Sequence, residues 1–208
     1  MKSLLYFEDG DVVAESGDVK VYQFNNELFL EIGPGHTLWA LESEVDDYIN
    51  QLWDYPKGRC LEIGLGLGVA SRCILTNPKV KNLTTVELRQ DVINTHEMIK
   101  PILDDGSRHN KWLTYVPKKH RIVNCNGLDY LLQTERTYDF IFIDFYACID
   151  EESLAEIYDM VQAAKRILNK DGSILCWLDK HTPKEFIEPF YSLFGEYLQE
   201  RRYRDGTT

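Results

Sequence analysis

The chain has 208 residues, 44% of them hydrophobic, which allows one α/β domain with a buried core and a small appendage. Its formal net charge of −11 argues against a nucleic-acid partner, because broad phosphate-binding surfaces depend on Lys and Arg. No apolar run approaches the length of a membrane span and the five cysteines are scattered, so we expect a cytoplasmic protein in a reducing compartment with no membrane partner.

Apolar and polar residues alternate in short segments over the first 33 residues, and turn residues such as Ser16-Gly17 separate these segments. This pattern predicts a small antiparallel β-meander. The expected strands are Ser3–Phe7, Val12–Glu15, Val19–Phe24 and Leu28–Ile32. Gly33-Pro34-Gly35 ends the alternation. We therefore place a β-hairpin or meander appendage at residues 1–35 and a second domain at residues 36–208.

The second domain begins with apolar residues at helical spacing, namely Leu41, Val45, Tyr48, Ile49 and Leu52. From residue 59 onward, strand and helix patterns alternate along the chain. The expected strands are Cys60–Ile63, Leu83–Glu87, Arg121–Cys125, Asp139–Phe145 and Ser173–Leu178, and the expected helices are 69–76, 91–103, 127–133 and 153–168. This alternation predicts an α/β, Rossmann-like, doubly wound and mostly parallel sheet. A capping box at Thr182–Glu185 predicts a final helix near 183–194, and the short remainder predicts an abbreviated C-terminal part.

The most specific motif lies between the first two expected strands of this domain. Glu62 precedes three glycines at alternate positions, Gly64, Gly66 and Gly68, and Glu87 ends the next strand. Glycines at this spacing let a ligand approach the backbone closely, because no Cβ intervenes. A carboxylate at the end of the second strand is placed to accept hydrogen bonds from ribose hydroxyls. The motif therefore predicts a site for an adenosine-containing ligand.

The position of Glu62 narrows the class of ligand. Dinucleotide sites usually read G-x-G-x-x-G, and a carboxylate two residues before the first glycine would repel a diphosphate. The sulfonium and ammonium groups of S-adenosylmethionine suit such a carboxylate. We therefore predict that Glu62, the three glycines, Glu87 and the adjacent Leu88 bind S-adenosylmethionine. The alternative is that Glu62 is a strand-end ion-pair partner and the glycines form a plain turn.

An acidic residue followed by G-x-G-x-G resembles the class I S-adenosylmethionine-dependent methyltransferases, and the chain as a whole resembles their spermidine-synthase-like branch. This resemblance implies that Asn126, which Gly127 follows, binds the adenine amino group; Asn126 is also a candidate helix cap. It implies that Asp144 lies beside the donor and orients or deprotonates the acceptor. Asp144 could alternatively cap a turn. We add Tyr146 as a second catalytic candidate.

Two departures from the aminopropyltransferase pattern bear on the reaction. Leu67 stands where those enzymes have an Asp that grips the propylamine of decarboxylated S-adenosylmethionine, and Ala147 replaces an acceptor-binding Asp. We therefore expect a methyltransferase acting on a small-molecule acceptor. The alternatives are an aminopropyltransferase that uses the decarboxylated donor and a non-catalytic adenosine-ligand-binding protein. No His, Cys or Asp cluster has metal-ligand spacing, so we expect no metal. The sequence leaves the oligomeric state open, and a homodimer is compatible with it.

Overall fold

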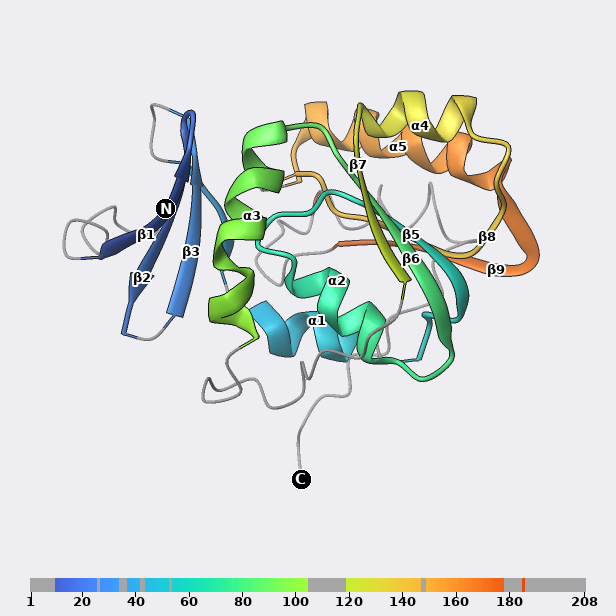
Figure 1. Ribbon diagram of the computed structural model, residues 1–208. Helices are drawn as coiled ribbons and strands as arrows, with labels where there is room; N and C mark the ends of the chain where they lie inside the picture. Colours follow the sequence, from blue (N-terminus) through green and yellow to red (C-terminus); the bar gives the residue numbers. More distant parts are fainter. Residues whose placement is uncertain are drawn as a thin grey trace.

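Figure 1 shows the computed structural model, which describes residues 10–25, 27–33, 37–41, 44–52, 54–104, 119–146, 149–177 and 185. The described strands form two separate sheets. The first is antiparallel, with the order β1-β2-β3-β4. Its strands are β1 (Asp11–Ser16), β2 (Val19–Phe24), β3 (Glu27–Ile32) and β4 (Thr37–Leu41).

The antiparallel sheet follows the alternation seen in the sequence. Val19 and Val21 of β2 and Leu28 and Leu30 of β3 are buried, and the residues between them on β2 are half-buried. The predicted N-terminal meander is thus confirmed for its last three expected strands, while Ser3–Phe7 lies outside the described residues. The sheet also gains β4, which ends at Leu41, a residue that we had expected at the start of a helix.

The second sheet has five strands in the order β7-β6-β5-β8-β9, and every neighbouring pair is parallel. Helix α1 precedes it, and helices α2 to α5 alternate with its strands. In chain order the elements are α1 (Val45–Leu52), β5 (Gly58–Ile63), α2 (Val69–Thr76), β6 (Val80–Glu87), α3 (Gln90–Leu103), β7 (Lys119–Asn124), α4 (Gly127–Gln133), β8 (Tyr138–Ile143), α5 (Glu151–Lys165) and β9 (Leu168–Cys176). The predicted Rossmann-like α/β fold is confirmed.

Right-handed crossovers decide which face each helix covers. The chain moves outward from β5 to β7 through α2 and α3 and then returns to the other side of β5 through α4 and α5. The two pairs of helices therefore lie on opposite faces, as Figure 1 shows for α2 and α5. The inner strand β8 is buried on both faces, and Phe140, Ile141, Phe142 and Ile143 are each 0% exposed. Such a sheet leaves its functional surface at the strand ends.

The strand order reverses between β5 and β8, which makes the carboxyl ends of these strands the topological switch point. Two boundaries differ from those expected. Helix α5 ends at Lys165 rather than near residue 168, because Leu168 already pairs with Tyr138 in the sheet. The expected helix at 183–194 and the chain beyond it lie outside the described residues. None of the described helices is both long and apolar enough to cross a membrane.

Candidate active site

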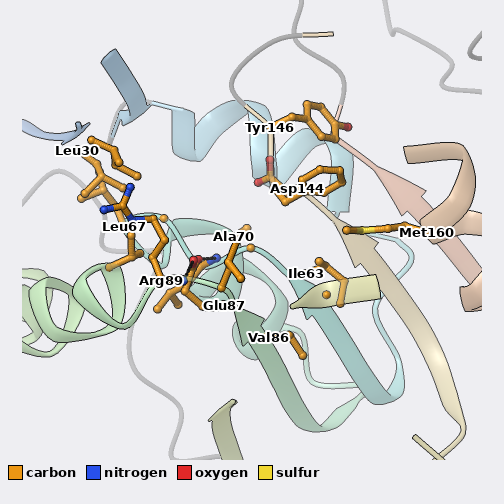
Figure 2. Close-up of a pocket in the computed structure, with 18 of the residues that line it drawn as sticks. Leu30, Ile63, Leu67, Ala70, Val86, Glu87, Arg89, Asp144, Tyr146 and Met160 are labelled. Atoms are coloured by element: carbon orange, nitrogen blue, oxygen red, sulfur yellow. Dashed lines mark hydrogen bonds between the residues drawn. The ribbon is translucent and has the colours of Figure 1, made fainter. Parts of the chain in front are cut away.

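A cavity of about 430 Å³ lies at the carboxyl ends of β5, β6 and β8, and β3 of the antiparallel sheet contributes to its wall. Most of the predicted site residues line this cavity (Figure 2). They are Gly64, Gly66, Glu87, Leu88, Asn126, Gly127, Asp144 and Tyr146. Residues that are distant in the sequence are thus brought together where the fold predicts a ligand site. Glu62 and Gly68 are the two predicted residues that do not line the cavity.

The glycine turn after β5 requires glycine for different reasons at its two ends. Gly64 has a φ of +98°, and a Cβ there would lie 1.9 Å from the carbonyl oxygen of Asp144. The turn is therefore pressed against the end of β8. Gly68 has a φ of +79°, and a Cβ there would lie 2.3 Å from the ring of His96 on α3. Gly68 thus lets the turn pack closely against α3, and its contact with the ligand stays a prediction.

Glu87 ends β6 and is held by the backbone. Its Oε2 accepts a hydrogen bond of 3.0 Å from the Leu65 amide, and its Oε1 accepts one of 2.8 Å from the Arg89 amide. Burial raises the pKa of this carboxyl group, and these amides oppose the rise. A carboxylate has about four acceptor positions, so two backbone bonds leave capacity for a pair of ribose hydroxyls. Its role in binding the ribose stays a prediction.

Glu62 occupies a different environment from the one that its spacing suggested. The side chain is 0% exposed, and its Oε2 accepts hydrogen bonds from the hydroxyl groups of Ser71 and Thr85. Within the described part of the chain, Oε1 has no hydrogen-bond partner. Burial raises the pKa of Glu62 to about 8, which favours the neutral carboxylic acid at pH 7. Glu62 thus lies behind the residues that line the cavity, and its contact with the ligand stays a prediction.

Asn126 and Gly127 form the start of α4 at one end of the cavity. Asn126 Oδ1 accepts a hydrogen bond of 3.1 Å from the Asp129 amide, which makes this residue the N-cap. An amide oxygen has a second lone pair, so the cap and an adenine contact are compatible. A Cβ on Gly127 would lie 2.5 Å from Ile63 Cγ2, so glycine is needed for the helix to approach β5. Met160 of α5 completes this end of the cavity.

Asp144 follows β8 and lies above the glycine turn. Tyr48 on α1 donates a hydrogen bond of 2.7 Å to Asp144 Oδ2. Burial raises the pKa of Asp144 to about 7, the bond from Tyr48 lowers it, and the nearby charge of Glu44 raises it. A carboxyl group with a pKa near 7 can exchange protons at physiological pH. Tyr48 and Glu44 also line the cavity and were missed, because Tyr48 looked like part of an apolar helix stripe.

Tyr146 lines the cavity with its ring and is 9% exposed. Its hydroxyl group donates a hydrogen bond to the main-chain carbonyl of Trp177, at the end of β9. Trp177 in turn packs on Tyr48, with ring centroids 4.3 Å apart. These contacts give Tyr146 a wall-forming position beside Asp144. Its catalytic role stays a prediction.

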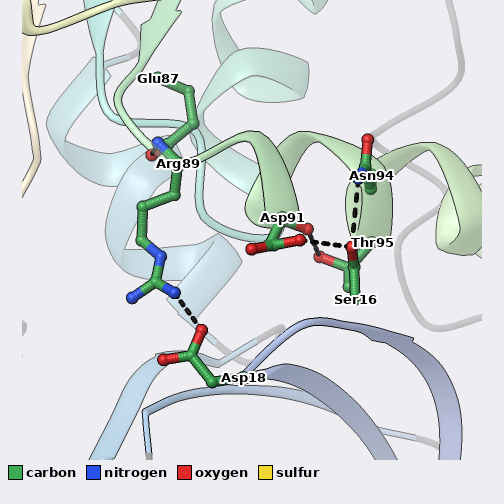
Figure 3. A network of polar contacts seen from close by, with 7 residues as sticks. All are labelled: Ser16, Asp18, Glu87, Arg89, Asp91, Asn94 and Thr95. Carbon is green, nitrogen blue, oxygen red and sulfur yellow. Dashed lines mark hydrogen bonds and ion pairs between the residues drawn. The ribbon is translucent and has the colours of Figure 1, made fainter.

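Arg89 is a further lining residue that sequence reasoning missed. It is the single Lys or Arg among the described residues around the cavity, and the carboxylates there belong to Glu44, Glu87, Asp144, Glu156 and Asp159. The Arg89 guanidinium pairs with Asp18 in the β1–β2 turn (Figure 3). Ser16, the last residue of β1, donates a hydrogen bond of 2.6 Å to Asp91 of α3. The antiparallel sheet is thus docked beside Glu87. Across the described residues, no group of three His, Cys, Asp or Glu side chains is placed to hold a metal ion.

The fold is of the class I methyltransferase type, with a spermidine-synthase-like architecture. Residues 52–187, more than half of the chain, match the spermine/spermidine synthase domain family. The chain therefore belongs to that family. Comparison with curated proteins gives no significant match.

Solved structures show the same architecture. Spermidine synthase from Thermotoga maritima superimposes with a TM-score of 0.64 at 15% identity, over 92% of this chain and 64% of that chain. A spermidine synthase in complex with the transition-state analogue AdoDATO gives a TM-score of 0.60 at 18% identity, over 89% of this chain and 63% of that one. This chain thus spans less than two thirds of either synthase. At these identities, the likeness concerns the fold.

Proposed function

We propose that the protein transfers a carbon group from the sulfonium of an S-adenosylmethionine-related donor to a small amine. The observation that carries this proposal is the position of Asp144. It is a half-buried carboxyl group with a pKa raised to about 7, beside the glycine turn and close to a second carboxyl group, Glu44. Cavity carboxylates favour a cationic sulfonium and a protonated amine. The family match supports the same chemistry.

The lining residues fit an adenosyl ligand in one orientation. Asn126, Gly127 and Met160 offer an adenine site with a polar edge and an apolar wall. Glu87, oriented by two amides, has acceptor capacity for the ribose hydroxyls. The glycine turn between Glu87 and Asp144 removes side chains from the path of the ligand. In this orientation, the reacting carbon lies on the Asp144 side of the cavity.

The residues around Asp144 would promote a direct displacement. The acceptor amine must lose a proton before or during attack, and Asp144 in its ionised form accepts that proton. Tyr48 fixes the carboxyl group through its 2.7 Å hydrogen bond, so the acceptor is positioned by a rigid group. The carbon–nitrogen bond forms as the carbon–sulfur bond breaks, and the electron pair stays on the sulfur. Most of the rate would come from alignment of the two substrates.

Family membership favours transfer of an aminopropyl group from decarboxylated S-adenosylmethionine as the first candidate reaction. Methyl transfer is the second candidate, and Leu67 favours it. Leu67 lines the cavity, is 1% exposed and offers no charge to a propylammonium group. The family profile bears on the whole domain, whereas Leu67 bears on one contact. For this reason we rank transfer of the aminopropyl group above transfer of the methyl group.

The test is a product assay with intact and decarboxylated donors against a panel of diamines and monoamines, read by mass spectrometry. We expect the wild-type protein to alkylate at least one amine and the Asp144→Asn variant to lose most of that activity. The product mass distinguishes an added methyl group from an added propyl chain. If the protein binds a donor but no amine is modified, the non-catalytic alternative is favoured and the proposal fails.

A further inference from the structure

Arg89 introduces a charge of opposite sign into an otherwise acidic cavity. It lies in the turn between β6 and α3, two residues after Glu87, and its own amide orients Glu87 Oε1. Among the described lining residues it is the one basic side chain, against five carboxylates. A ligand that fits this cavity as a whole therefore has an anionic group at the Arg89 end.

The position of Arg89 in the cavity indicates which part of a bound donor would lie near it. Figure 2 shows its side chain extending away from Glu87 toward Leu30 and Leu67, while Met160 lies at the opposite end. A donor with its ribose on Glu87 and its adenine beside Met160 directs its remaining tail over the glycine turn, toward Leu67. The Arg89 guanidinium is within the same part of the cavity wall as that tail.

The guanidinium keeps hydrogen-bonding capacity for a ligand. It pairs with Asp18, and the two side chains are 36% and 46% exposed. Exposed pairs of this kind contribute little free energy and rearrange easily. A guanidinium has five N–H donors arranged to bind carboxylates, so one partner does not exhaust it. The ion pair with Asp18 therefore leaves the Arg89 guanidinium able to bind a ligand.

We propose that Arg89 binds the α-carboxylate of a donor that retains its amino-acid tail, and so selects intact over decarboxylated S-adenosylmethionine. This inference rests on the proposed function, the transfer of a carbon group from a sulfonium donor, and departs from it in one respect: it replaces the decarboxylated donor, which family membership alone ranks first, by the intact one. Leu67 agrees with it, because its side chain offers no carboxylate to an ammonium group that arrives alone. A decarboxylated tail would place its ammonium near the Arg89 cation, which is repulsive.

The choice of donor changes the group that could be transferred. Attack at the propyl carbon of an intact donor forms the new carbon–nitrogen bond and releases methylthioadenosine, with the acceptor proton going to Asp144. The transferred chain then carries both an amino and a carboxylate group. Attack at the methyl carbon releases S-adenosylhomocysteine instead. The spermidine-synthase-like family favours the first of these displacements.

Calorimetric titration without an acceptor tests the inference, with intact and decarboxylated S-adenosylmethionine as the two ligands. We expect the wild-type protein to prefer the intact donor by about 10-fold or more, as befits a hydrogen-bonded charge pair. Arg89→Gln should reduce the preference to about twofold or less, by weakening the intact donor. Asp18→Asn is the matched control, because it breaks the same ion pair and keeps the guanidinium. It should retain the preference.

Three results would overturn the inference while leaving the proposed function in place. The first is a wild-type protein that binds both donors equally or favours the decarboxylated one, and the second is an Arg89→Gln variant that keeps the wild-type preference. Loss of the preference in Asp18→Asn to the same extent as in Arg89→Gln would also overturn it, since the docked sheet would then be the cause. Absence of binding by either donor would instead overturn the proposed function itself, and this inference with it.

Discussion

The hydroxyl group of Tyr48 lies 2.7 Å from Asp144 Oδ2, so a residue of α1 is hydrogen-bonded to the residue that follows the inner strand β8. Helix α1 precedes the parallel sheet in the chain, and this bond connects it to the candidate general base. The same tyrosine packs on Trp177 at the end of β9. Asp144 is therefore held from outside its own strand. A carboxyl group fixed in this way can serve a reaction that depends on alignment.

Tyr48→Phe should shift the pH dependence of the reaction upward. The Tyr48 bond lowers the pKa of Asp144, which is about 7, so its removal raises that pKa. Asp144 must be ionised to accept a proton, and activity should therefore rise with pH through a higher midpoint. At pH 7 we expect a loss of about 10-fold in kcat/KM that is largely recovered at higher pH. The pH profile of kcat/KM measures this.

The Asp144→Asn variant serves as the control for that profile. It should lose activity at every pH, because no carboxylate remains to be ionised. An unchanged midpoint in Tyr48→Phe would show that Asp144 does not govern the acid limb of the profile.

Glu87→Gln should weaken donor binding by about 10- to 100-fold, because charge-assisted hydrogen bonds to the ribose are lost. The glutamine oxygen can still accept a bond from the Leu65 amide, so the fold should persist. Glu97→Gln on the exposed part of α3 removes one negative charge at a carboxylate paired with Lys100 and outside the cavity, and should bind the donor like wild type. Titration calorimetry compares the three proteins. Equal affinity in wild type and Glu87→Gln would refute the ribose assignment.

Gly64→Ala should destabilise the protein far more than Gly33→Ala. Both glycines have positive φ, +98° and +81°, and each alanine pays about 1–2 kcal/mol for that backbone conformation. At Gly64 the new Cβ would also lie 1.9 Å from the Asp144 carbonyl oxygen, whereas at Gly33 the nearest atom is 3.9 Å away. We expect Gly64→Ala to cost about 3 kcal/mol or more. Urea unfolding of both variants measures the difference, and equal losses would contradict the close packing at Gly64.

Glu62→Gln should alter how stability depends on pH. Burial raises the pKa of Glu62 from 4.5 to about 8, so the folded protein binds an extra proton between these values. The contribution of Glu62 is thus complete below pH 4.5 and is lost as the pH rises through about 8. Glutamine cannot ionise and can accept the same hydroxyl bonds from Ser71 and Thr85. The free energy of unfolding of the variant should therefore increase relative to that of wild type as the pH rises.

Urea unfolding at several pH values between 5 and 9 supplies this comparison (roughly the window in which the shifted group ionises). Asp144 also has a raised pKa, and its effect is common to both proteins. The difference between wild type and Glu62→Gln therefore isolates Glu62. A difference that does not vary with pH would mean that Glu62 is ionised in the folded protein across this range.

The parallel sheet was predictable because each of its strands is a short apolar run followed by a helical pattern. Helices α2 and α4 were expected at the residues where they occur. The strand β4 was missed, since Gly33-Pro34-Gly35 looked like the end of the meander although Ile32 and Thr37 still pair across it. The boundary between α5 and β9 was also misplaced. The helical periodicity of the sequence continues to Leu168, but this residue already belongs to β9 and pairs with Tyr138 of β8.

The site residues could be predicted from the sequence where their place at a strand end determines their role. They were harder to predict where side-chain packing determines it. Glu87 and Asp144 follow strands whose carboxyl ends meet at the switch point, so their convergence was expected. Glu62 lies one residue inside β5, and the side-chain alternation of a strand turns it toward Ser71 and Thr85. Tyr48 and Arg89 reach the cavity through contacts with Asp144 and Asp18, residues distant in the sequence. No local pattern reveals such contacts.

A crystal structure with a bound sulfonium donor tests the central claim most directly. The account predicts adenine at the Asn126–Met160 end of the cavity, both ribose hydroxyls within hydrogen-bonding distance of Glu87, and the sulfonium on the Asp144 side of the glycine turn. Density for the donor outside this cavity, or a ribose that makes no contact with Glu87, would contradict it.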